Sequence, residues 1–128
     1  MDKINEEKNK TEMKTHLQGI ADILSLKGFE NKFDITESTL YDIIKNRSAG
    51  KKYAEKIQIG LSELKFEGMD LTDIENYLIK YRQCFNILGI ERKAGIPEKS
   101  LSTLVRVPGF TYFKKTHIEK VCEILRSV

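Results

Sequence analysis

The sequence has few cysteines and no long apolar run, and these absences narrow the class of protein that it encodes. Its 128 residues include only two cysteines, Cys84 and Cys122, too few for a disulfide framework and typical of a reducing compartment. No apolar stretch approaches the roughly 20 residues that a membrane-spanning helix needs. The polar first residues lack the apolar core of a secretory signal. We therefore expect a cytoplasmic protein with no membrane partner.

The motifs of catalysis and cofactor binding are missing as well. Neither a GxxxxGK[ST] phosphate loop nor a GxGxxG fingerprint occurs, and no nucleophile motif surrounds either cysteine. The soft metal ligands Cys84, Cys122, His16 and His117 lack the paired spacing of a zinc site. Cys122 falls on an apolar stripe, where it reads as a small core residue. We expect no enzyme activity, no cofactor and no metal.

The residues that are present describe a charged globular chain with two basic clusters. Hydrophobic residues make up 40% and charged residues 32%. The net charge is only +3. Within it, residues 45–56 hold five basic side chains against one acidic, and residues 92–128 hold eight against three. Such clusters are often simply solvated faces, but they also suit the phosphate backbone of a nucleic acid.

Apolar residues recur at three- and four-residue spacings along most of the chain, which predicts an all-α fold. No stretch alternates as a strand does. Small polar residues over 36–39 predict a cap before a helix that begins near Leu40. Thr72 and Glu75 have the spacing of a capping box, and Pro97 suits the first turn of a later helix.

The sequence also resembles itself when it is shifted so that Gly28 falls on Gly89. The same shift places Glu30 on Glu91, and apolar positions follow in the same order. We call two residues that this shift superposes counterparts. The self-similarity predicts an internal duplication. We expect a flexible arm over 1–10, a first segment over 11–66, a connector over 67–71 and a second segment over 72–128. Each segment is expected to form a four-helix unit, and the two units are expected to pack together.

The middle of each segment resembles the helix-turn-helix core of Cro/C1-type phage repressors. In the second segment the matching stretch is IERKAGIPEKSLS, residues 90–102. Gly95 stands at the turn glycine of that family, and Ile96 and Leu101 stand at its buried positions. In the first segment, residues 29–44 fit with Asp34 in place of the glycine, and Asp tolerates left-handed backbone better than most residues.

A second departure from the family concerns Glu30 and Glu91, which stand where it often has a small alanine. The resemblance implies a compact helical bundle that usually binds DNA as a dimer, with the helix after the turn in the major groove. It implies base contacts from Thr36, Glu37, Ser38 and Tyr41 in the first segment, and from Pro97, Glu98, Lys99 and Ser102 in the second. Phosphate contacts, which position a protein without reading sequence, would come from Lys45, Arg47, Lys51, Lys52, Arg106, Lys114 and Lys115.

The preferred function is sequence-specific binding of double-stranded DNA by a small phage or bacterial transcriptional regulator, with two recognition helices in one chain. The glutamates Glu37 and Glu98 complicate this reading, because Glu accepts a hydrogen bond from cytosine but is repelled by phosphate. The alternative is a protein-binding inhibitor or adaptor, for example a phage protein acting against a host defence system. A third reading is single-strand binding through Tyr112 and Phe113, although a core role for these rings is preferred. Further association into a homodimer stays open.

Overall fold

The computed structural model describes residues 12–45, 53–107 and 113–128, and their regular secondary structure is helical apart from one isolated bridge. The first segment contains a helix over residues 12–20, then α2 (Leu26–Lys32), α3 (Thr39–Ile44) and α4 (Ala54–Glu63). The second contains α5 (Leu71–Tyr81), the 3₁₀ turn η2 (Arg82–Cys84), α6 (Ile87–Ala94), α7 (Ser100–Arg106) and α8 (Lys115–Arg126). The all-α prediction is confirmed for these residues. The predicted arm over 1–10 and the candidates Arg47, Lys51, Lys52 and Tyr112 lie outside them.

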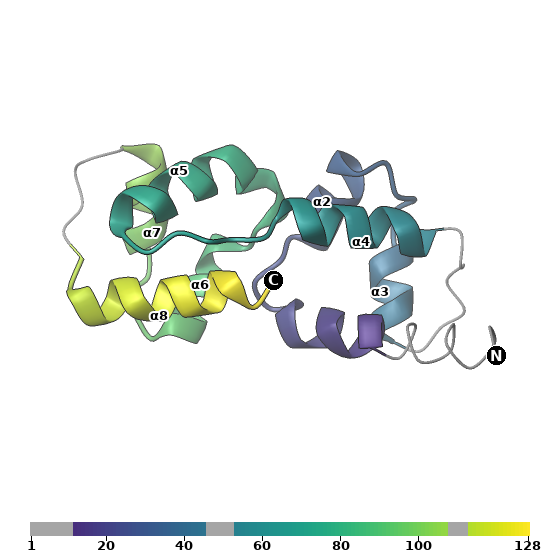
Figure 1. The fold of residues 1–128 in the computed structure, drawn as a ribbon, viewed down its shortest axis with the longest axis horizontal. Helices are drawn as coiled ribbons and strands as arrows, with labels where there is room; N and C mark the ends of the chain where they lie inside the picture. Colours follow the sequence, from purple (N-terminus) through teal and green to yellow (C-terminus); the bar gives the residue numbers. More distant parts are fainter. Residues whose placement is uncertain (1–11, 46–52, 108–112) are drawn as a thin grey trace.

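The two segments occupy opposite ends of an elongated molecule (Figure 1). Helices α4 and α8 lie at diagonally opposite places about the centre of this view, as do α5 and the helix over residues 12–20. Among the described residues, no helix is long and apolar enough to cross a membrane.

Apolar stripes predicted from the sequence form the core of each segment. The fully buried side chains include Leu17, Phe29, Leu40, Ile57, Leu78, Ile90, Leu101 and Leu125. Each contributes roughly 1.5–3 kcal/mol relative to an exposed side chain. Cys122 and Phe113 are also buried, which confirms the core role predicted for both residues.

Reciprocal hydrogen bonds join the segments at the centre of the molecule. The backbone N–H of Ser25 donates to the carbonyl of Cys84 at 2.9 Å, and that of Asn86 donates to the carbonyl of Ile23 at 2.8 Å. The two donors are counterparts under the shift that superposes Gly28 and Gly89, and so are the two acceptors. Equivalent parts of the two segments therefore exchange the same bond, which is the pattern of a two-fold, self-complementary contact.

Two glycines allow this close approach. An added Cβ on Gly28 would lie 1.6 Å from the carbonyl oxygen of Gln83, and one on Gly89 would lie 1.9 Å from that of Asp22. Gln83 and Asp22 are themselves counterparts, so the two contacts are again equivalent. Glycine weakens a helix interior, and here it is required because α2 and α6 each touch backbone of the other segment.

The predicted starts of α5 and α7 are wrong in detail. Helix α5 begins at Leu71, so the capping box is formed by Asp70 and Asp73 instead of Thr72 and Glu75. The Asp70 carboxylate accepts from the backbone N–H of Asp73 at 2.9 Å, and the Asp73 carboxylate accepts from that of Asp70 at 3.3 Å. Pro97 does not lie in the first turn of α7, because a turn residue with left-handed backbone, Lys99, comes between them.

Candidate functional site

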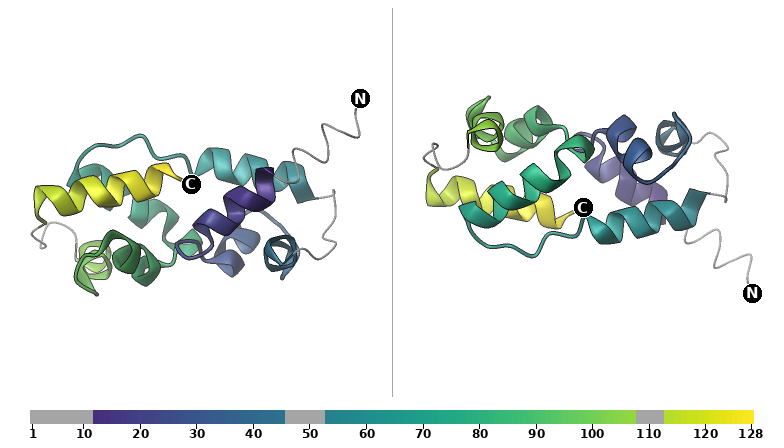
Figure 2. Two further views of the ribbon diagram at one scale, coloured as in Figure 1. Left: turned by 90° about the horizontal axis from the view of Figure 1, so that it is seen from below. Right: turned by 90° about the horizontal axis from the view of Figure 1, so that it is seen from above.

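Helices α3 and α7 lie on one face of the molecule (Figure 2), and most of the predicted base contacts lie in the turns that lead into them. Figure 2 shows both nearly end-on along the same edge, at opposite ends of the long axis. The segment between α4 and α5 runs along the opposite edge. We call the surface shared by α3 and α7 the α3–α7 face. The structure therefore brings the two sets of candidate base contacts to one side.

A buried carboxylate holds the start of each of these helices. The Glu30 carboxylate accepts from the backbone N–H of Leu40 at 2.9 Å, and the Glu91 carboxylate accepts from that of Leu101 at 2.8 Å. Weaker contacts reach the N–H groups of Ser38 at 3.3 Å and Ser102 at 3.4 Å. The two glutamates are among the few buried charged side chains, with 3% and 1% of their surfaces exposed.

These carboxylates replace the side-chain cap that was expected from residues 36–39, and that prediction is wrong. Neither Ser38 nor Lys99, the residues just before α3 and α7, makes a side-chain cap bond. Both have positive φ, 72° and 74°. The first N–H groups of a helix need acceptors, and an anion there is also favoured by the helix dipole. Glu30 and Glu91 meet both needs and tie α3 to α2 and α7 to α6.

The turn before each helix is built alike in the two segments. Asp34 has φ 56° and Gly95 has φ 69°, so the aspartate adopts the left-handed backbone that was expected of it. In each turn the next residue bonds back to the buried glutamate's carbonyl, Ile35 to Glu30 at 2.9 Å and Ile96 to Glu91 at 3.1 Å. The departures from the repressor pattern are thus accommodated in both segments.

Most of the predicted base-contact residues are accessible. The exposed ones are Thr36, Glu37, Ser38, Tyr41, Pro97, Glu98 and Lys99. Ser102 is half-buried, and its hydroxyl donates to the carbonyl of Lys99 at 3.1 Å. Thr36 shares a hydrogen bond with the hydroxyl of Tyr53. The accessible set is therefore polar and able to meet base edges, but the threonine already has a partner.

The charge of the α3–α7 face is mixed. Lys45 and Arg106 are exposed at the C-terminal ends of α3 and α7. The Arg92 guanidinium lies 3.1 Å from the Glu98 carboxylate, and both side chains are more than half exposed. Such a pair stabilises the fold by at most about 1 kcal/mol, but it offsets the negative charge of Glu98. The remaining described phosphate candidates, Lys114 and Lys115, are exposed at the start of α8.

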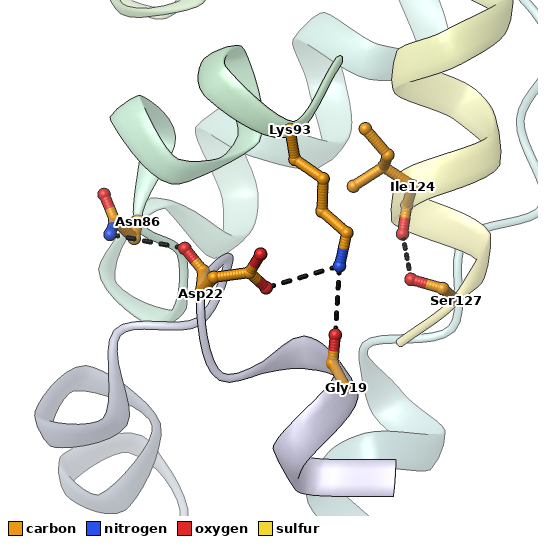
Figure 3. Close-up of polar contacts among 6 residues, drawn as sticks. All are labelled: Gly19, Asp22, Asn86, Lys93, Ile124 and Ser127. Carbon is orange, nitrogen blue, oxygen red and sulfur yellow. Dashed lines mark hydrogen bonds and ion pairs between the residues drawn. The ribbon is translucent and has the colours of Figure 1, made fainter. Parts of the chain in front are cut away.

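A polar cluster joins the two segments. The Lys93 ammonium donates to the carbonyl of Gly19 at 3.0 Å and to the Asp22 carboxylate at 3.3 Å, and the Asn86 amide donates to the carbonyl of Asp22 at 3.4 Å (Figure 3). No sequence motif predicted this cluster. The matched pair Gly28 and Gly89 was its one available signal, because two glycines inside helical stripes indicate a close backbone approach.

Comparisons with known protein families, with curated proteins and with solved structures found no match for this chain. Within the described part of the chain, no group of three or more His, Cys, Asp or Glu side chains is placed to hold a metal ion.

Proposed function

We propose that the protein binds double-stranded DNA through two helix-turn-helix-like units, with α3 and α7 as the recognition helices. The proposal extends to a small phage or bacterial transcriptional regulator, as the resemblance to Cro/C1-type repressors implies. Such a regulator acts by occupancy, because a protein held in the major groove blocks or recruits polymerase.

The observation that carries the proposal is the matched construction of α3 and α7. Each helix follows a residue with left-handed backbone, and a buried glutamate accepts a hydrogen bond from an N–H group in its first turn. An exposed cation stands at the C-terminal end of each helix. Both helices lie on the α3–α7 face (Figure 2). In helix-turn-helix proteins the N-terminal residues of the recognition helix contact base edges. Here the exposed residues 36–38 and 97–99 lie in the turns just before α3 and α7, and Tyr41 and Ser102 lie in the first turn of each helix.

The phosphate-binding part of the proposal rests on paired cations. Lys45 and Arg106 are counterparts in the two segments and stand at equivalent ends of α3 and α7. Cations at these places would contact the backbone on either side of the groove and position the helices without reading sequence. The ion pair with Arg92 would reduce the repulsion between Glu98 and phosphate.

A second candidate function is binding of a protein partner, as an inhibitor or adaptor. The observation that favours it is the presence of exposed Glu37 and Glu98 at equivalent positions of the α3–α7 face. Two acidic side chains in the same place suit a basic protein surface better than a polyanion. The third reading, stacking of single-stranded bases on Phe113, loses support because that ring is buried.

The test is a fluorescence-anisotropy titration against random duplex DNA and random single strand at two salt concentrations. Non-specific affinity for DNA is electrostatic and precedes specificity. We expect salt-sensitive binding to duplex that is tighter than binding to single strand. Absence of binding to both at low salt would overturn the DNA proposal and favour the protein-binding candidate.

A further inference from the structure

We infer that a single chain of this protein recognises an inverted repeat in duplex DNA, one arm with α3 and the other with α7. This inference rests on the proposed function and specifies its substrate. A duplication in one chain is equally compatible with direct repeats, in which both units face the same way along the DNA. The contacts between the segments decide between these arrangements.

The central contacts between the segments are reciprocal. Ser25 bonds to Cys84 while Asn86, the counterpart of Ser25, bonds to Ile23, the counterpart of Cys84. Leu24 and its own counterpart Phe85 face each other between these bonds as an antiparallel bridge. A translation along the chain, as in a stacked repeat, places different surfaces against each other. Only a rotation that exchanges the segments places a residue beside its own equivalent.

The glycine contacts give the same answer independently of the hydrogen bonds. Gly28 touches the carbonyl of Gln83, and Gly89 touches that of Asp22, the counterpart of Gln83. Because both glycines lie this close to backbone of the other segment, backbone contacts define the relative orientation of the two segments. The polar cluster around Lys93 adds side-chain contacts to the same junction (Figure 3).

The direction of the two-fold axis follows from the positions of the equivalent helices. In Figure 1 the equivalent helices α4 and α8 lie diagonally opposite each other about the centre, so the axis runs along the line of sight. Figure 2 shows α3 and α7 on the same side along that line. The axis is therefore perpendicular to the α3–α7 face, and the two helices run in opposite directions across it.

Duplex DNA has dyads that match this geometry. A two-fold axis perpendicular to the binding face coincides with a dyad of the duplex, and the two recognition helices then meet the same bases on opposite strands. The preferred site is an inverted repeat whose arms are about one helical turn, or a multiple, apart. One chain fills both arms. The arms are similar but not identical, because Tyr41 and Ser102 differ at equivalent positions whereas Glu37 and Glu98 are the same.

The experiment selects bound sequences from a random-duplex library with the full chain, and then repeats the selection with Glu37→Gln and Glu98→Gln. Both glutamates are exposed, and circular dichroism checks that the variants fold. We expect an enriched inverted repeat bound by one chain, with stoichiometry read by native mass spectrometry. Glu37→Gln should alter base preference in one arm only, and Glu98→Gln in the other arm only. The two altered positions should lie at equal distances from the centre of the site, on opposite strands.

The outcomes separate this inference from the proposed function. An enriched direct repeat, a single motif without a dyad, or two chains on each inverted repeat would overturn the inference while leaving DNA binding intact. Duplex binding without any enriched sequence would overturn it too. If the chain retains no duplex at low salt, both the inference and the proposed function fail.

Discussion

Leu24 and Phe85, which are counterparts in the two similar segments, face each other at the centre of the molecule as an isolated antiparallel bridge. A residue beside its own equivalent defines the two-fold relation on which the placement of α3 and α7 depends. Substitutions can test the parts of this arrangement separately.

The buried glutamates should stabilise the fold to a similar extent. Glu30→Ala and Glu91→Ala each remove the acceptor for a buried backbone N–H, and such an orphaned donor costs about 1–3 kcal/mol. Urea unfolding should show a loss of this size for both variants. Glu37→Ala, at an exposed position, should change the free energy of unfolding by less than about 0.5 kcal/mol. Equal stability of all three would contradict the capping role.

The close approach of the segments predicts opposite effects for three glycine substitutions. Gly28→Ala and Gly89→Ala place a Cβ against backbone of the other segment, and overpacking of this kind costs about 1–3 kcal/mol. Gly19 lies in the helix over residues 12–20, and its Cβ would meet nothing within 4 Å. Gly19→Ala should therefore stabilise the protein by roughly 0.5–1 kcal/mol. Thermal unfolding of the three variants measures these differences, and the expected order fails if Gly28→Ala is neutral.

The phosphate contacts are tested by Lys45→Gln and Arg106→Gln, with Lys65→Gln as the matched control. Lys65 is exposed in the segment between α4 and α5. That segment runs along the edge opposite the α3–α7 face (Figure 2). All three variants lose one positive charge. The first two should weaken duplex binding and lower the slope of log affinity against log salt by about 1, because one fewer counterion is released. If Lys65→Gln weakened duplex binding and lowered the salt slope as much as the other two variants, net charge alone would govern binding.

The Asp70–Asp73 capping box predicts a dependence of stability on acid. Backbone N–H groups of Met69 and Asp70 donate to the Asp73 carboxylate and lower the pKa of that group below its ordinary value. A lowered folded-state pKa contributes stability above the unfolded pKa of about 4, and the contribution is lost as pH falls through the folded value. Asp73→Asn should therefore melt at a lower temperature than the wild type at pH 7. The difference should shrink below about pH 4, and a constant difference would contradict this account.

Much of the fold could be predicted from the sequence because short apolar stripes bury their faces locally. The 3.6-residue period marked Leu17, Ile57, Leu78 and Leu125 as core, and all are buried. Helix starts were harder to predict, since Thr72 and Asp70 both offer oxygens near one N-terminus. In the structure Asp70 is the cap and Leu71 begins α5.

The role of the buried glutamates could not be predicted, because it depends on contacts between helices. The bond from Glu91 to Leu101 spans a turn whose path rests on two left-handed residues, Gly95 and Lys99. Local pattern gives no rule for such a path. The repeat of Glu30 and Glu91 where the family often has alanine was nevertheless visible, and it marked the position as special to this chain.

The most direct test of the central claim is a nuclear magnetic resonance titration of the labelled chain with duplex DNA. We predict that amide shifts gather at residues 36–45 and 97–106, at both ends of the molecule, while those of the segment between α4 and α5 stay unchanged. Shifts confined to one end would assign DNA binding to one segment alone. Shifts centred away from α3 and α7, or none at low salt, would contradict the account.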